Sequence, residues 1–223
     1  MGSIRNLTPR QEVRREKILS ATRKLVASQG FDGMVMSDVA EAACVSPTTL
    51  YNLYNTKDEL LLEALRGLVV KNYEKVGQRF GVGSWRYLLG VVENGAWLRS
   101  AEPEYGEAIT DALLRAKPGD PLTQLLFENV RQDFAYSLKQ MKLRGELAGG
   151  VDPQHLAVIL LGNYWGTFLL LNKGIEKSRR LIHSANINLL SVLIASTCGE
   201  VKKEMSDHIL ELRRWQREEL KSD

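Results

Sequence analysis

The stretch that decides the fold is MSDVAEAACVSPTTLYNLY, residues 36–54. It predicts two short helices joined by a tight turn at Cys44 and Val45. Ser46 is suited to cap the second helix, and Pro47 presets its first turn. The pattern indicates a helix-turn-helix, although any hairpin of two helices shows similar apolar spacing. The apolar side chains spaced to pack together are Val39, Ala43, Val45, Leu50 and Leu53.

The face opposite this apolar side carries Thr48, Thr49, Tyr51 and Asn52. These are short hydrogen-bonding side chains and one aromatic ring, which suit base edges and phosphates in a major groove. The second helix is therefore the candidate recognition helix.

Helix-start signals divide the rest of the chain. A capping box begins at Thr8 and opens a helix that Gly30 ends, and a second box begins at Thr56 and opens a helix to about Phe80. Further helices are expected over 84–100 and 104–116, from the Asp-Pro pairs at 120 and 152, and from Ser178 towards the C-terminus. No window shows the alternation of a strand. The sequence predicts an all-α fold of nine or ten helices.

Residues 10–65 resemble the TetR family of bacterial transcriptional regulators in both spacing and residue type. The matching residues are Arg15 to Leu19, Ala21, Gly30-Phe31, Asp38 to Ala43, Val45-Ser46, Thr49 to Tyr51, Tyr54, Lys57 and Glu59-Leu60. The remaining chain is similar only in its helical pattern and length.

The resemblance implies a three-helix DNA-binding domain over residues 1–56 and a helical effector-binding and dimerisation domain over 57–223. It implies a homodimer on an inverted-repeat operator, most simply a repressor released by a small hydrophobic or amphipathic effector. Carried over to this sequence, the DNA-binding residues are Ser46, Pro47, Thr48, Thr49, Tyr51, Asn52, Tyr54 and Lys57.

Two positions depart from the family pattern. Cys44 stands where the family usually has glycine, so a positive φ there would strain the turn. A redox-sensing role for this thiol is a minor hypothesis, because no second cysteine is near it in sequence. Leu53 replaces a frequently polar residue, and we expect it to add packing.

In the second domain, polar and aromatic residues interrupt apolar helices, and a ligand is one way to satisfy buried polar groups. Such residues more often satisfy each other or water. The candidate ligand-binding residues are Glu93, Asn94, Trp97, Phe127, Arg131, Phe134, Asn163 and Tyr164. The resemblance implies an effector pocket among the fifth to eighth helices.

The segments 153–172 and 179–198 are too apolar to face water, so we expect them to pair across a two-fold axis as a four-helix bundle. Gly162 and Gly166 would permit close approach. The apolar run from Leu156 to Leu171 is expected to fall short of the ~20 residues that cross a bilayer.

The composition and the motifs of the chain limit which other classes of protein it could belong to. The chain has 223 residues, 44% hydrophobic and 26% charged, with a net charge of +3 whose basic excess lies in residues 1–57. Two cysteines show no metal-binding spacing, three histidines are scattered, and no catalytic motif is present, so we expect no metal, no cofactor and no enzyme. Without a signal peptide, a cytoplasmic location is expected. An architectural DNA-binding protein and a helical interaction protein remain as alternatives.

Overall fold

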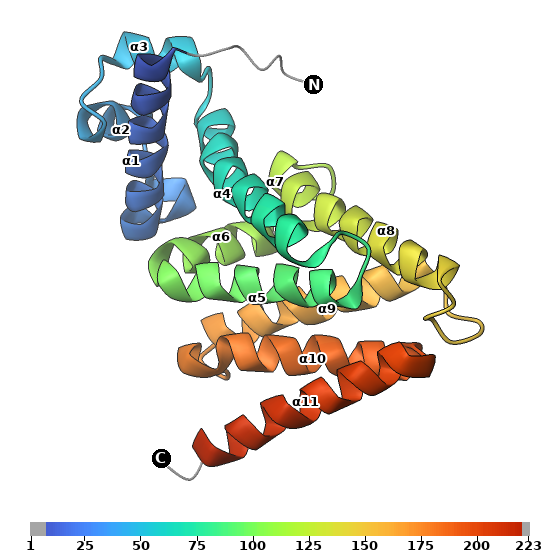
Figure 1. Cartoon of the computed structure of the whole chain (residues 1–223). Helices are drawn as coiled ribbons and strands as arrows, with labels where there is room; N and C mark the ends of the chain where they lie inside the picture. The colour runs from blue at the N-terminus through green and yellow to red at the C-terminus, as the bar shows by residue number, and fades with distance from the viewer. Residues whose placement is uncertain (1–7, 220–223) are drawn as a thin grey trace. The chain divides into compact units, whose positions relative to one another are not determined.

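The computed structural model describes residues 8–219, with the side chains of 68–72 and 215–219 excepted, and the elements of this part of the chain are helices apart from one isolated bridge (Figure 1). The helices are α1 (Pro9–Gly33), α2 (Met36–Ala42), α3 (Pro47–Leu53), α4 (Lys57–Phe80), α5 (Trp85–Ala101), α6 (Pro103–Arg115), α7 (Pro121–Thr123), α8 (Asn129–Leu143), α9 (Pro153–Asn172), α10 (Leu181–Ser196) and α11 (Gly199–Glu219). A π-helical segment, Gln124–Glu128, joins α7 to α8 without a break. If α7, the π-helical segment and α8 are counted as one helix, the described residues form ten α-helices. The all-α prediction is therefore confirmed.

The chain divides into two compact units. The first comprises residues up to 70 together with 102–115, and the second comprises 71–101 and the residues from 116 onwards. The first unit therefore contains α6 as well as the helix-turn-helix. The helix α4 supplies residues to both units.

In the first unit, α1 packs against α2 and α6. Its start is fixed by the predicted capping box, in which Thr8 and Gln11 exchange side-chain bonds with each other's backbone N–H groups. Gly30 has φ +78°, a conformation that interrupts the helix as expected and that glycine adopts without steric cost. The core contains the fully buried side chains of Ile18, Val39 and Leu50.

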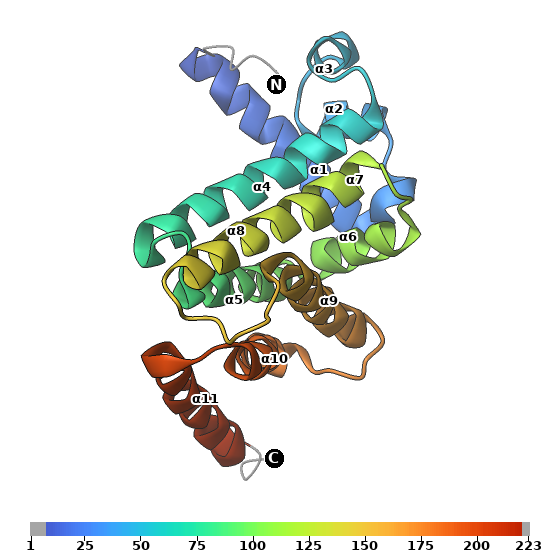
Figure 2. The same cartoon turned by 90° about the vertical axis from the view of Figure 1, so that its right-hand side faces the viewer.

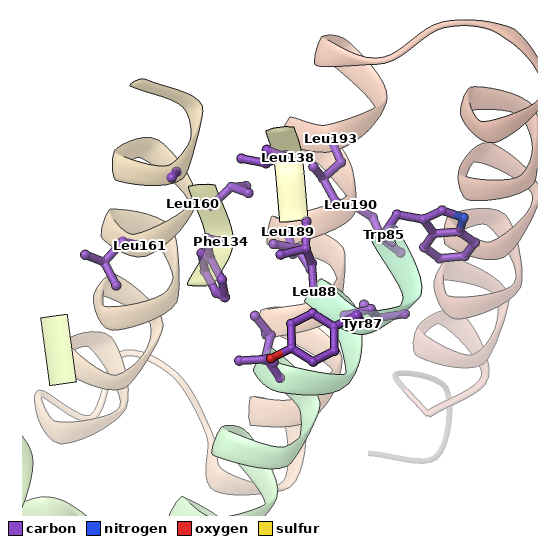
Figure 3. Packing of buried hydrophobic residues seen from close by; sticks show 14 of the residues in the cluster. Trp85, Tyr87, Leu88, Phe134, Leu138, Leu160, Leu161, Leu189, Leu190 and Leu193 are labelled. Carbon is purple, nitrogen blue, oxygen red and sulfur yellow. The ribbon is translucent and has the colours of Figure 1, made fainter. Parts of the chain in front are cut away.

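In the second unit, α10 packs against α5, α9 and α11, while α8 packs against α9 and α5 (Figure 2). Leucines from four of these helices, Leu88, Leu138, Leu160 and Leu190, are fully buried and gather around Phe134 (Figure 3). Each buried leucine contributes roughly 1.5–3 kcal/mol of hydrophobic stabilisation. This apolar cluster gives the second unit a core of its own.

The segment after Ser178 is not one helical region. A bridge between Leu147 and Thr197 holds extended chain between α10 and α11, and Gly199 adopts φ +66° at the reversal. The helix α11 then folds back, with Met205 and Ile209 buried in the core. The sequence did not predict which part of the protein the segment after Gly199 contacts. In the structure, α11 packs against α10.

The helix α9 has the bounds expected for it, Pro153–Asn172. It has 20 residues, and within the described chain it is the helix long and apolar enough to cross a membrane by length and composition. A third of the residues in its apolar window are buried inside the protein, and the core helix of a protein outside membranes passes the same test. Length and composition alone therefore do not make α9 a membrane span.

Candidate functional sites

The start of α3 is held by its predicted cap. The Ser46 hydroxyl accepts the backbone N–H of Thr49 at 3.1 Å and lies 2.8 Å from the Thr49 hydroxyl, and Pro47 occupies the first turn. A serine cap of this kind stabilises a helix by ~1 kcal/mol. The cap fixes the direction in which the following side chains leave the helix.

Those following side chains form an exposed face. Thr48 and Asn52 are exposed, and Tyr51 is 52% exposed. Leu53 is 46% exposed, so the expectation that it packs inside the domain is wrong. An exposed leucine beside Asn52 offers an apolar contact for a thymine methyl group. Together these four residues are called the α3 face.

The turn before α3 carries backbone strain. Cys44 adopts φ +54°, the left-handed region that its side chain disfavours by roughly 1–2 kcal/mol. The turn is closed by the Val45 N–H, which donates to the Ala40 carbonyl at 3.0 Å. The suspicion that this position needs positive φ is confirmed, and the thiol of Cys44 is exposed.

Two predicted DNA contacts have other partners in this structure. Tyr54 is only 6% exposed, and burial raises the pKa of its hydroxyl while the adjacent Arg15 lowers it. Arg15 also pairs with Glu63, so Tyr54 belongs to the packing between α1 and α4 and not to the exposed surface. Lys57 donates from Nζ to the carbonyl of Asp32 at 2.7 Å, and it must leave that bond to reach a phosphate.

The N-terminus of α4 is fixed by half of the expected capping box. The Thr56 hydroxyl accepts the Glu59 N–H at 3.1 Å, but the Glu59 carboxylate accepts the N–H of Asn55, one residue earlier than predicted. Both bonds hold the first turn of α4. Free N–H groups at such a terminus attract phosphate oxygens.

Two of the predicted effector residues, Glu93 and Arg131, have partners within the protein. Glu93 accepts a bond from Asn186 at 3.0 Å. Arg131 pairs with Glu128 at 2.6 Å and donates to Gln154. The Arg131 guanidinium lowers the pKa of the Glu128 carboxyl to about 2. These pairs satisfy the groups that the sequence offered as ligand contacts.

Four further candidates differ in burial. Phe134 is fully buried in the apolar cluster, where it acts as a packing residue, whereas Trp97 is 55% exposed (Figure 3). Asn94 and Asn163 are intermediate, and the Asn163 carbonyl accepts the hydroxyl of Thr167 at 2.9 Å. The four candidates therefore differ in surroundings, from the apolar core at Phe134 to the surface at Trp97.

The structure does bring Phe127 and Tyr164 together, in a set of four rings that we call the aromatic group. Ring centroids lie 5.4 Å apart for Phe127 and Trp165, 5.4 Å for Tyr164 and Trp165, and 4.8 Å for Tyr164 and Phe168. The indole Nε1 of Trp165 is buried and has no hydrogen-bond partner among the described residues. Sequence reasoning missed Trp165 and Phe168, although both share the apolar helix that holds Tyr164.

A polar set from α4, α5 and α8 lies near Tyr164. The Tyr87 hydroxyl donates to the Asp133 carboxylate at 2.7 Å. Burial raises the pKa of Asp133, and the bond from Tyr87 opposes that rise. The pKa of Tyr73 is raised by burial, and Tyr164, Asp133 and Tyr87 raise it further. We call Tyr73, Tyr87 and Asp133 the hydroxyl–carboxylate group; no pattern in the sequence indicated it.

Gly95 makes room for Tyr164. A Cβ atom built on Gly95 would lie 1.8 Å from the Tyr164 hydroxyl oxygen and 2.9 Å from Cζ. Only glycine permits α5 to approach this ring so closely. Tyr164 therefore packs against α5 at Gly95 and against the rings of Trp165 and Phe168.

The helix α9 also has an uncovered apolar side. Val158 is 50% exposed, Ile159 41% and Leu170 43%, and a Cβ on either Gly162 or Gly166 would meet nothing within 4 Å. On α10, the exposed positions 188, 191 and 195 hold Asn, Ser and Ala at helical spacing. The apolar side of α9, with its small residues, is thus covered by nothing in the described chain, whereas the exposed positions of α10 are small and mainly polar.

Two short helices joined by a tight turn, the second of them capped and exposing hydrogen-bonding side chains, form a helix-turn-helix. Residues 18–64 match the bacterial regulatory proteins of the tetR family, which is the family that the sequence resemblance predicted for this region. The match covers the helix-turn-helix and the residues around it, and not the rest of the chain. Among the described residues, no group of His, Cys, Asp and Glu could hold a metal ion.

Relatives and solved structures agree with this assignment. The chain is 31% identical over 61 residues to the HTH-type transcriptional regulator BetI of Rhizobium meliloti, a match over 27% of this chain and 30% of BetI. It resembles a TetR-family regulator from Rhodococcus sp., with TM-score 0.68, 20% identity and 82% and 99% of the two chains covered. It also resembles SmeT, the repressor of the Stenotrophomonas maltophilia efflux pump SmeDEF, with TM-score 0.66, 16% identity and 84% and 92% covered; SmeT is also known in complex with triclosan. The matches to curated relatives span under a third of those proteins.

Proposed function

We propose that this chain is a ligand-responsive repressor that binds an inverted-repeat operator as a homodimer. The observation that carries the proposal is the α3 face, in which a serine-capped helix presents Thr48, Tyr51 and Asn52 to solvent. Thr48 and Asn52 supply base readout, while Thr49 and Tyr51 position the helix on phosphates. Lys57 adds a phosphate contact once it leaves the Asp32 carbonyl. The function is exercised in the cytoplasm.

DNA binding is assigned to residues 1–56, and effector binding and dimerisation to 57–223. Dimerisation uses 153–172 and 179–198, where the uncovered side of α9 supports the assignment. Valine, isoleucine and leucine at 41–50% exposure are costly to leave in water, and Gly162 and Gly166 let two helices approach closely. A two-fold pairing of α9 and α10 forms a four-helix bundle.

The effector acts through α4. This helix supplies residues 57–70 to the unit with the helix-turn-helix and 71–80 to the unit with the aromatic group. A ligand that shifts the second part of α4 shifts Lys57 and the α3 face with it. Two recognition helices fit half-sites ~34–36 Å apart, so a small change in their separation releases DNA.

The proposal is tested by selecting bound sites from a random duplex library at fixed salt concentration. We expect an enriched inverted repeat, and the Asn52→Ala protein is expected to lose preference at one position of each half-site. A matched control is Asn129→Ala, an exposed residue of the second unit, which should select the same repeat. Uniform, salt-sensitive binding without enrichment would contradict the proposal and support an architectural DNA-binding protein.

A further inference from the structure

The Asp133 carboxylate has no charged partner. Its hydrogen bond comes from the neutral hydroxyl of Tyr87 at 2.7 Å, and no described Lys, Arg or His side chain lies within ion-pair distance of it. The side chain is half-buried, and burial acts against its charge. A carboxylate in such surroundings is stabilised by a cation, because the opposite charge offsets the loss of water.

The surfaces beside this carboxylate are aromatic. The helix α8, which carries Asp133, packs against α9, which carries Tyr164, and both of these side chains raise the pKa of the Tyr73 hydroxyl. Trp165 and Phe168 lie 5.4 and 4.8 Å from the Tyr164 ring. Aromatic faces attract cations through their quadrupole, most strongly for tryptophan. The charge of the Asp133 carboxylate and the neighbouring aromatic rings therefore both favour a positively charged ligand.

The indole N–H of Trp165 favours a ligand that carries a hydrogen-bond acceptor. Its nitrogen is buried, and no described group accepts its hydrogen bond. Leaving such a buried donor without a partner costs free energy, which an acceptor atom on a ligand recovers. The ring of Tyr164 lies edge-on to that of Trp165, with 5.4 Å between centroids, and its hydroxyl occupies the space that glycine leaves at position 95.

We propose that the effector is an apolar or aromatic organic cation, whose positive group is held by Asp133 and whose body lies against Tyr164, Trp165 and Phe168. This proposal rests on the proposed function, in which an effector binds the second unit. It makes the site selective, because a carboxylate or phosphate ligand of the same shape would be repelled by Asp133. A hydrogen-bond acceptor on the ligand reaches the Trp165 indole.

Three probes of one shape test this selectivity. The cation is (1-naphthylmethyl)trimethylammonium, the neutral compound replaces its nitrogen by carbon, and the anion is 1-naphthylmethanesulfonate. Binding to the full chain is measured by calorimetry and by the shift in melting temperature. We expect the cation to bind at least 10-fold more tightly than the neutral compound, with the anion weakest.

Asp133→Asn keeps the acceptor for Tyr87 and removes the charge. In this variant the cation should lose its advantage, while the neutral compound binds as before. Asp207→Asn, on an exposed position of α11, changes the net charge equally and should leave all three affinities unchanged. Equal binding of cation and anion, no binding of the cation, or a preference that survives Asp133→Asn would each overturn the inference.

DNA binding separates this inference from the proposed function. Wild type and Asp133→Asn should select the same inverted repeat without any probe, because Asp133 lies in the unit without the helix-turn-helix. If the repeat is selected but the charge preference is absent, only the ligand class is wrong. If no repeat is selected, the proposed function fails whatever the probes show.

Discussion

Replacing Gly95 by alanine tests how tightly Tyr164 is held. In the middle of α5, alanine favours the helix over glycine by roughly 1 kcal/mol. The added Cβ, however, would lie 1.8 Å from the Tyr164 hydroxyl oxygen, which real contacts do not allow. Displacing the ring costs ~1–3 kcal/mol of packing. We expect Gly95→Ala to lower the free energy of unfolding by about 1 kcal/mol net.

The sign of the effect should reverse when Tyr164 is absent. In a Tyr164→Ala background the clash is gone and only the helix preference remains, so Gly95→Ala should stabilise by roughly 1 kcal/mol. Gly67→Ala is the matched control, since a Cβ there meets nothing within 4 Å and should stabilise in both backgrounds. Urea unfolding of the four proteins of the cycle, at one protein concentration, measures the coupling. If Gly95→Ala is stabilising with Tyr164 present, the close approach of α5 to this ring is refuted.

Four further outcomes follow from the helix-turn-helix and the α9 surface. Ser46→Ala should lower DNA affinity and cost ~1 kcal/mol of stability in thermal unfolding, and an unchanged melting temperature would argue against its cap. Cys44→Gly should raise stability by about 0.5–1 kcal/mol in urea unfolding, because relief of the positive φ exceeds the extra freedom of unfolded glycine. Gly162→Leu should leave the subunit folded by circular dichroism and produce monomers in sedimentation, and intact dimers would place the interface elsewhere. Lys57→Ala should weaken binding equally for all sequences and reduce the salt slope by about 1 in titrations at several salt concentrations; a loss confined to one operator would assign it a base contact.

Local signals in the sequence predicted most of the helices. The capping residues Thr8, Ser46 and Thr56 act within three residues of themselves, and the apolar spacing of α2 and α3 repeats within one or two turns. Such signals depend on bonds between neighbours in the chain, so they can be read without the fold. The same locality made the strain at Cys44 predictable, because its φ is set by the turn it closes.

The partners of the candidate effector residues could not be predicted from the sequence. Glu93 and Arg131 were chosen as ligand contacts because they are polar residues in or beside apolar helices, and in the structure each has a partner from its own or another helix. The exposure of Leu53 and the burial of Tyr54 were also missed, because both depend on which helices cover each side of α3 and α4. Side chains that contact residues far away in the sequence produce no periodic pattern from which those contacts could be predicted.

The helical nature of the chain, the starts of its helices and the helix-turn-helix over residues 36–54 could all be predicted from the sequence, since these features arise from contacts a few residues apart. The fold was needed to show that Tyr87, 46 residues from Asp133, donates a hydrogen bond to it, and that Gly95 admits the ring of Tyr164. It was also needed to show that α11 packs back on α10, with Met205 and Ile209 buried. Those contacts join helices whose pairing depends on how all their apolar surfaces are buried at once, and no local pattern specifies that arrangement.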